Sequence, residues 1–150
     1  MSKANAERKI YGINACQSFF QRFPERIIRA WITEEAAKIR FGPMMKYLAQ
    51  EKRAYHLADG EELERVTESS HHEGVCLLIQ ELPVFTPESW LAGLKPGKPV
   101  CVLALDGVSN PHNLGAIMRV AAHFGVGAIL TENALALRTG SAMRTAEGGA

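Results

Sequence analysis

Residues 100–130, VCVLALDGVSNPHNLGAIMRVAAHFGVGAIL, decide the fold of this chain, because they predict a strand, a helix and a second strand in succession. The apolar runs at 100–105 and 127–130 have the length and composition of buried strands. Apolar side chains recur between these runs at the spacing of one helix face: Leu114, Ile117, Met118, Ala121 and Phe124.

The helix in this stretch has clear boundaries. Asn110 is a preferred N-cap residue, and Pro111 suits the first helical position. Gly125 stands where a left-handed residue commonly ends a helix. Because a strand–helix–strand crossover is almost always right-handed and returns the chain in the same direction, we expect the two strands to be parallel.

Polar side chains gather in the turn after the first strand, at the sheet edge where ligands bind in open parallel sheets. They are Asp106, Ser109, Asn110, His112 and Asn113. Arg119 is a cation within the otherwise apolar helix, and its side chain should lean back over Gly115, which leaves a path to the turn. These residues predict a site at the turn; the alternative is a solvated arginine beside ordinary capping residues.

Composition and cysteine usage are those of a soluble globular protein, with 47% hydrophobic and 22% charged residues. The polar N-terminus lacks the apolar core of a signal peptide, and no apolar run reaches the roughly 20 residues of a membrane span. The three cysteines, Cys16, Cys76 and Cys101, are an odd number without a pattern, which indicates a reducing compartment, the cytoplasm. We expect Cys76 and Cys101 to be small core residues of predicted strands.

Breakers divide the chain into two domains. Residues 83–98 are dense in proline and glycine and predict a linker with one short helix near 89–94. Residues 10–82 alternate helices with short strands, which predicts a compact α/β domain, and residues 99–150 form the second domain. Residues 1–9 are expected to be a flexible tail. A helix should then run from Ile10 to Phe20, followed by strands at 27–32, 54–57 and 75–79 and by helices that begin near Thr33, Pro43 and Asp59.

Charge is distributed unevenly although the net charge is only +1. Residues 1–53 hold eleven Lys or Arg against five Asp or Glu, whereas residues 54–82 hold one against seven. The asymmetry is compatible with a basic face that contacts phosphates. It is equally compatible with two oppositely charged faces that attract each other within one small domain.

The helix residues also carry a family resemblance. Asn113-Leu114-Gly115, Arg119, Ala121 and Phe124-Gly125 resemble the first signature motif of the SpoU (TrmH) family of the SPOUT superfamily. These enzymes use S-adenosylmethionine to methylate ribose 2′-hydroxyls of tRNA or rRNA. The resemblance implies an α/β fold, in which a small α/β/α RNA-binding sandwich precedes the first part of a SPOUT-type α/β-knot domain with a parallel sheet. It implies that Arg119 and Asn113 are catalytic, and it suggests substrate-RNA contacts at Asn110, His112, Ser141, Glu147 and His72.

The first domain resembles the family's substrate-binding domain, although more loosely. Tyr11-Gly12 is similar to the start of that domain, and residues 72–75, His-Glu-Gly-Val, are similar to its His-Gln-Gly motif. Glu73 stands where the family has glutamine. Because a carboxylate cannot donate a hydrogen bond and repels phosphate, we do not expect Glu73 to contact RNA directly.

The chain ends within the resemblance. Residues 144–150, RTAEGGA, resemble the start of a later family segment, and the knot motifs that hold S-adenosylmethionine and much of the dimer interface do not occur in these 150 residues. We therefore expect an inactive fragment of a homodimeric tRNA or rRNA ribose 2′-O-methyltransferase, which by itself neither binds the cofactor nor methylates RNA. The alternative is a non-catalytic protein that binds structured RNA.

Two other chemistries are disfavoured. His71, His72 and Cys76 could suggest a metal, but adjacent histidines on an extended backbone point to opposite faces and no ligand-type spacing is present, so no metal is expected. Dinucleotide binding would use Glu132 as the ribose-binding acid. However, the turn DGVSNPHN lacks the glycines that let a backbone approach a pyrophosphate.

Overall fold

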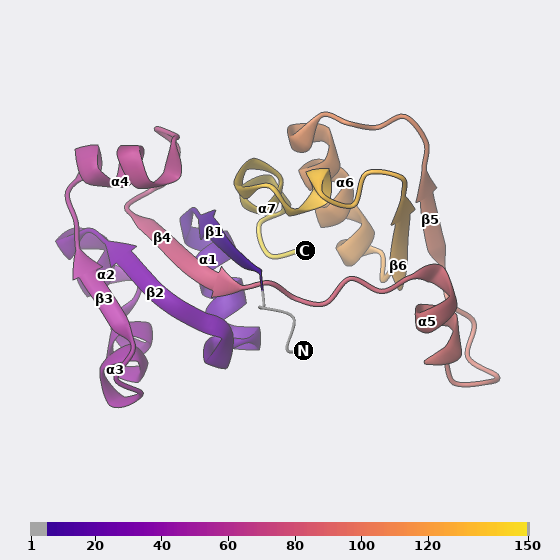
Figure 1. Ribbon diagram of the computed structural model, residues 1–150, viewed down its shortest axis with the longest axis horizontal. Helices are drawn as coiled ribbons and strands as arrows, with labels where there is room; N and C mark the ends of the chain where they lie inside the picture. The colour runs from indigo at the N-terminus through magenta and orange to yellow at the C-terminus, as the bar shows by residue number, and fades with distance from the viewer. Residues whose placement is uncertain (1–5, 150) are drawn as a thin grey trace.

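The computed structural model describes residues 6–149, which form two units joined by an extended segment with one short helix, α5 (Pro87–Ala92) (Figure 1). The first unit contains β1 (Glu7–Tyr11), α1 (Ile13–Arg22), η1 (Pro24–Arg26), β2 (Ile27–Ile32), α2 (Glu34–Ile39), α3 (Gly42–Gln50), β3 (Ala54–Leu57), α4 (Gly60–Thr67) and β4 (Val75–Gln80). The second contains β5 (Val102–Leu105), α6 (Pro111–His123), β6 (Ala128–Thr131), η2 (Ala136–Arg138) and α7 (Gly140–Ala146).

The first unit is a three-layer sandwich around a sheet with the strand order β1-β4-β2-β3. Strand β4 runs antiparallel to β1 and β2, and β2 runs parallel to β3. Alternate residues of β4 point to opposite faces, so Leu77 packs with Cys16 of α1 and Met44 of α3, whereas Cys76 packs with Leu63 of α4. The predicted α/β/α arrangement is confirmed.

The N-terminal prediction was wrong. Glu7–Tyr11 is a strand rather than a tail followed by a helix, and α1 begins only at Ile13 after Gly12, whose φ is 93°. The segment ERKIY has too few apolar residues to reveal an edge strand, and pairing with β4 decides its conformation, with Ile10 opposite Leu77. Residues 1–5 of the predicted tail lie outside the described part of the chain.

The other predicted elements of the first unit are confirmed in kind and position. Thr33 caps α2 by accepting a hydrogen bond from the Ala36 N–H, and Asp59 caps α4 by accepting one from the Glu62 N–H. Cys76 is buried as expected, but Cys101 is exposed: it lies just before β5, and no residue of β5 is itself buried, so the expectation of a buried strand there was also wrong. The prediction that Cys101 is a core residue was therefore wrong.

The second unit contains the predicted parallel pair, with Val102 opposite Ala128. Asn110 caps α6 by accepting from two backbone N–H groups, Pro111 occupies the first turn, and Gly125 has a φ of 69°. A sheet of two strands buries little apolar surface. Apolar side chains of this unit therefore remain exposed to solvent, and Phe124 is 77% exposed. No helix within residues 6–149 is both long and apolar enough to cross a membrane.

Helix α7 fills the space between the two units. It packs against α6 on one side and against β1 and α1 on the other (Figure 1). Glycines permit both approaches: a Cβ on Gly115 would lie 2.5 Å from the carbonyl oxygen of Ala142, and one on Gly140 would lie 2.5 Å from the Tyr11 ring. The second unit is thus docked onto the first through a helix in which all residues but Met143 and Arg144 are small.

Candidate functional site

The polar turn at residues 106–113 lies exposed beyond the carboxyl ends of β5 and β6. Its conformation is fixed by local hydrogen bonds. The amide oxygen of Asn110 accepts from the N–H groups of His112 (2.9 Å) and Asn113 (3.3 Å), and the N–H of Gly107 donates to Glu132 (3.2 Å). The capping role predicted for Asn110 is therefore what orders the turn.

Arg119 faces α7 rather than the turn. Its Nη1 lies 3.2 Å from Oε2 of Glu147, and both side chains are about half exposed. The expected path along Gly115 to the turn is occupied, because α7 crosses α6 at that glycine. Among residues 6–149 no hydrogen bond joins Arg119 to Asn113, so the idea that Arg119 reaches the turn was wrong.

A cleft of about 130 Å³ opens beside Arg119, between the two units. Its walls come from Gly12, Asn14, Ala15 and Glu73 of the first unit and from Arg119, Arg144, Thr145 and Glu147 of the second. Two arginines and two carboxylates face each other here in pairs, Arg119 with Glu147 and Arg144 with Glu73 (2.9 Å). The cleft is polar and open, and each guanidinium is already held by a carboxylate.

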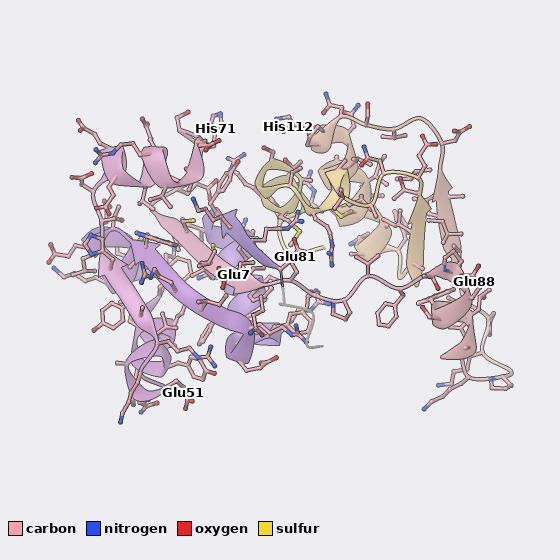
Figure 2. All side chains as sticks on the ribbon, viewed as in Figure 1. Glu7, Glu51, His71, Glu81, Glu88 and His112 are labelled. Carbon is pink, nitrogen blue, oxygen red and sulfur yellow. The ribbon has the colours of Figure 1, made fainter. Side chains whose placement is uncertain are left out.

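The remaining predicted residues divide into two groups. His112 lies at the start of α6 (Figure 2), with Nδ1 3.3 Å from the Thr145 hydroxyl, and Ser141 lies 3.3 Å from the Tyr11 hydroxyl. His112 therefore contacts α7 through Thr145, and Ser141 of α7 contacts β1 through Tyr11. His72 is instead buried, and its Nδ1 accepts the Gly74 N–H at 3.0 Å, which leaves little of its ring to meet an RNA.

Sequence reasoning missed the pairing of Glu73 with Arg144. The two residues are 71 positions apart and belong to different units, so no spacing rule connects them. The only local signal is that Arg144 is the one cation of a helix in which every other residue except Met143 is small. That pattern indicates a helix in close contact with neighbours but does not identify the partner of its cation.

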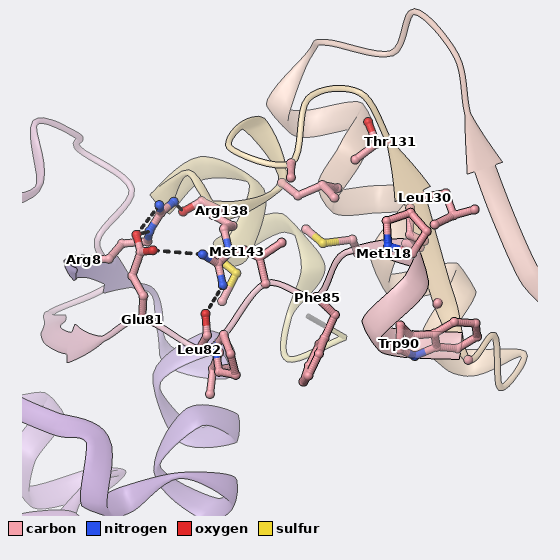
Figure 3. Close-up of a pocket in the computed structure, with 18 of the residues that line it drawn as sticks. Arg8, Glu81, Leu82, Phe85, Trp90, Met118, Leu130, Thr131, Arg138 and Met143 are labelled. Carbon is pink, nitrogen blue, oxygen red and sulfur yellow. Dashed lines mark hydrogen bonds and ion pairs between the residues drawn. The ribbon is translucent and has the colours of Figure 1, made fainter. Parts of the chain in front are cut away.

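A larger, mostly apolar cavity of about 520 Å³ lies under the joining segment (Figure 3). Phe85 and Trp90 of that segment line it together with Met118, Leu130 and Met143. One end is closed by a charged network, in which Glu81 pairs with Arg138 (2.9 Å) and accepts from Nε of Arg8 (2.7 Å). The network joins β1 and the end of β4 to η2 and is a second link between the units.

No group of three or more His, Cys, Asp or Glu side chains in the described residues is arranged to hold a metal ion.

Two protein-family models match the chain. One, described as "RNA 2'-O ribose methyltransferase substrate binding", matches residues 9–85, and the other, the "SpoU rRNA Methylase family", matches residues 100–150. A protein of Escherichia coli O157:H7 named "Uncharacterized tRNA/rRNA methyltransferase YfiF" is 44% identical over 96% of this chain and 41% of its own length. The Pseudomonas putida protein named "23S rRNA (guanosine-2'-O-)-methyltransferase RlmB" is 32% identical over 81% of this chain and 49% of its own length.

Solved structures show the same fold. A crystal structure titled as an RNA 2′-O ribose methyltransferase superposes with a TM-score of 0.72 at 20% identity, over 97% of this chain and 53% of its own. The AdoMet-bound rRNA methyltransferase from Sinorhizobium meliloti gives a TM-score of 0.68 at 16% identity, over 95% of this chain and 51% of its own. The chain thus spans about two fifths to one half of the length of the proteins it matches.

Proposed function

Because the chain belongs to the SpoU family of RNA ribose methyltransferases, we propose that it binds a structured tRNA or rRNA through its first unit and presents Arg119 to a ribose 2′-hydroxyl. The observation that carries this proposal is the place of Arg119, in a cleft with walls from both units. An RNA held by the first unit would meet the half-exposed guanidinium across that cleft. For the whole protein, the proposal includes ribose 2′-O-methylation and a homodimeric state.

Arg119 would act as an orienting and charge-stabilising group. A guanidinium with a pKa above about 12 is a poor general base, but its planar fork binds phosphate and a developing oxyanion well. Glu147 holds this fork in the cleft before RNA arrives. Asn113, exposed on the first turn of α6, would contact the RNA backbone beside the turn instead of orienting Arg119.

The described residues do not fit S-adenosylmethionine by themselves. Such a cofactor needs a largely enclosed pocket with hydrogen-bonding groups for its adenosine and amino-acid parts. The carboxyl ends of β5 and β6 instead lead into exposed residues, among them Asp106 and Glu132, which form an open edge. No catalytic step through the cofactor is therefore derived from these residues, and cofactor binding is proposed only for a longer protein.

The first unit offers one surface suited to RNA. On the sheet face that α4 only partly covers, the Arg29 guanidinium lies 5.7 Å from the centre of the Trp31 ring. Cation and aromatic surfaces of this kind stack on unpaired RNA bases. Lys9 is on the same face, but its ammonium donates to the Val66 carbonyl at the end of α4, so part of the basic charge stabilises the domain instead.

The proposal is tested by titrating the 150-residue chain with a structured rRNA fragment and with tRNA at several salt concentrations. We expect affinity to fall with salt, with a slope near −0.7 to −0.9 per phosphate contact. Arg29→Ala and Arg119→Ala should each weaken binding, whereas Arg65→Ala, an exposed cation in the last turn of the acidic helix α4, should not. Binding that ignores salt and both substitutions would refute the proposal.

In a longer protein that carries this chain, a methylation assay distinguishes a ribose methyltransferase from a non-catalytic RNA-binding protein. An enzyme should lose activity in Arg119→Ala and recover little in Arg119→Lys, because lysine keeps the charge but not the bidentate fork. A non-catalytic RNA-binding protein would show no methyl transfer with any variant. Full activity of Arg119→Lys would refute the orienting role.

A further inference from the structure

The Glu73 carboxylate joins the two units at the edge of the cleft. Oε2 accepts a hydrogen bond from the N–H of Ile13 at 2.8 Å, and Oε1 accepts one from Nη2 of Arg144 at 2.9 Å. The N-cap position of α1 is Gly12, which has no side chain to satisfy the first N–H groups of the helix. A single carboxylate therefore caps α1 in the first unit and binds the cation of α7 in the second.

The backbone around Glu73 is bent to make this possible. Glu73 has a φ of 54° and Gly74 a φ of 80°, so two consecutive residues adopt a left-handed conformation that side chains disfavour. The buried His72 holds the bend, since its Nδ1 accepts the Gly74 N–H and its carbonyl accepts the Val75 N–H. A strained residue retained against its preference commonly marks a functional constraint.

Arg144 is held more firmly than a surface cation usually is. Its Cγ would lie 3.0 Å from a Cβ on Gly12, so the side chain runs directly over the backbone before α1. Its Nε is buried and finds no hydrogen-bond partner within residues 6–149, which leaves the ion pair with Glu73 as the main compensation for the lost hydration. This geometry differs from that of exposed pairs, such as Glu34 with Lys38, where both side chains are 72% exposed.

The same helix ends at the residue that holds Arg119. Glu147 is the C-cap of α7, three residues after Arg144, and is itself left-handed with a φ of 50°. Ser18 and Gly148 fix this end as well, because the serine hydroxyl donates to the Gly148 carbonyl at 3.4 Å. Displacement of α7 from the first unit would therefore move the Glu147–Arg119 pair relative to that unit.

We propose that Glu73 is a positioning residue: through Arg144 it fixes α7, and with it the Glu147–Arg119 pair, against the RNA-binding unit. Its importance for catalysis rests on the function proposed for Arg119. The mechanical link itself, from one unit to the other, is independent of RNA.

The first test measures backbone hydrogen exchange of α7 in the intact 150-residue chain. Glu73→Gln keeps an acceptor for the Ile13 N–H but removes the charge, and Arg144→Gln removes the other partner. Each should accelerate exchange at α7 about two- to fivefold, the range expected for one ion pair of this exposure. The double variant should be no faster than either single variant, because both remove the same interaction.

The matched control is Glu62→Gln, which neutralises a carboxylate of the same unit that pairs with His56 at 3.1 Å. It should leave α7 exchange unchanged. The proposal would be overturned if the effects of Glu73→Gln and Arg144→Gln on α7 exchange were additive. It would also be overturned if Glu62→Gln accelerated that exchange equally.

The second test follows the Arg119 Nε–H signal in the arginine-labelled chain. Glu73→Gln should shift this signal and speed its exchange with water, although within residues 6–149 Glu73 pairs with Arg144 and not with Arg119. An unmoved signal would overturn the positioning role even if overall stability fell. If the chain binds RNA but Glu73→Gln leaves the Arg119 signal unmoved, only the positioning role of Glu73 is refuted. If the signal moves but the chain does not bind RNA, only the proposed function is refuted.

Discussion

Gly115 is the point at which the architecture is most sensitive to a small change. It is buried in α6, where α7 crosses, and an added Cβ would meet the Ala142 carbonyl oxygen at 2.5 Å and the Thr145 Cβ at 2.6 Å. One neighbour is a helix backbone, which cannot rotate away as a side chain can. We therefore predict that Gly115→Ala forces α7 away from α6 and destabilises the chain.

The size of the effect follows from two opposed terms. Overpacking in a closed contact lowers the free energy of unfolding by about 1–3 kcal/mol. Replacing glycine by alanine within a helix raises it by about 1 kcal/mol. Gly42→Ala in α3 is the matched control, because within residues 6–149 no atom beyond the chain neighbours and the helix's own backbone lies within 4 Å of the added Cβ. It should raise stability by up to about 1 kcal/mol. If this gain is common to both variants it cancels, and they then differ by the overpacking cost of about 1–3 kcal/mol.

Urea unfolding of both variants at 25 °C measures the difference directly. Hydrogen exchange of α7 in Gly115→Ala should also rise, because the contact that holds Ala142 and Ala146 is lost. Equal stability of the two variants, with α7 protected as in the parent chain, would refute the close crossing of α6 and α7.

Four further predictions address other parts of the molecule. Thiol titration at pH 8 should modify Cys101 quickly and leave Cys16 and Cys76 intact, because burial raises the pKa of both and brings that of Cys76 to about 12. A raised pKa in the folded state means that the free energy of unfolding is fully retained below about pH 9 and declines as pH rises toward 12; a value that stays constant to pH 12 would contradict this burial. Glu81→Ala should cost about 1–3 kcal/mol because it leaves Arg8 and Arg138 without their shared carboxylate, whereas Glu25→Ala, whose pair with Arg26 spans 3.9 Å, should stay within about 0.5 kcal/mol in the same assay. Calorimetry of the 150-residue chain with S-adenosylmethionine should give no binding heat, and stoichiometric binding would contradict the open edge at β5 and β6.

The strand–helix–strand unit was predictable because its signals are local. Asn110, Pro111 and Gly125 act on residues within one turn of themselves, and each does in the structure what its chemistry predicts. The resemblance of Arg119 to a family position was also readable from one helix. These inferences required no knowledge of what lies beside the helix.

The errors concern contacts between distant segments. β1 has a polar sequence, and its partner β4 begins more than sixty residues later, so only pairing reveals the strand. Arg119 was expected at the turn because the path over Gly115 looked open in sequence. The same small residue that suggested an open path is what admits α7, so the glycine indicates a helix crossing instead.

The pairing of Arg119 with Glu147 changes what the proposed RNA binding must accomplish at this residue. The guanidinium forms an ion pair with Glu147, and both side chains of this pair are about half exposed. An ion pair of that exposure contributes at most about 1 kcal/mol, so a phosphate or an oxyanion that enters the cleft can replace the carboxylate at little cost. Glu147 would then keep the arginine oriented before the proposed RNA substrate arrives and would compete little with it once it is bound, provided that α7 stays fixed to the first unit through Glu73 and Arg144.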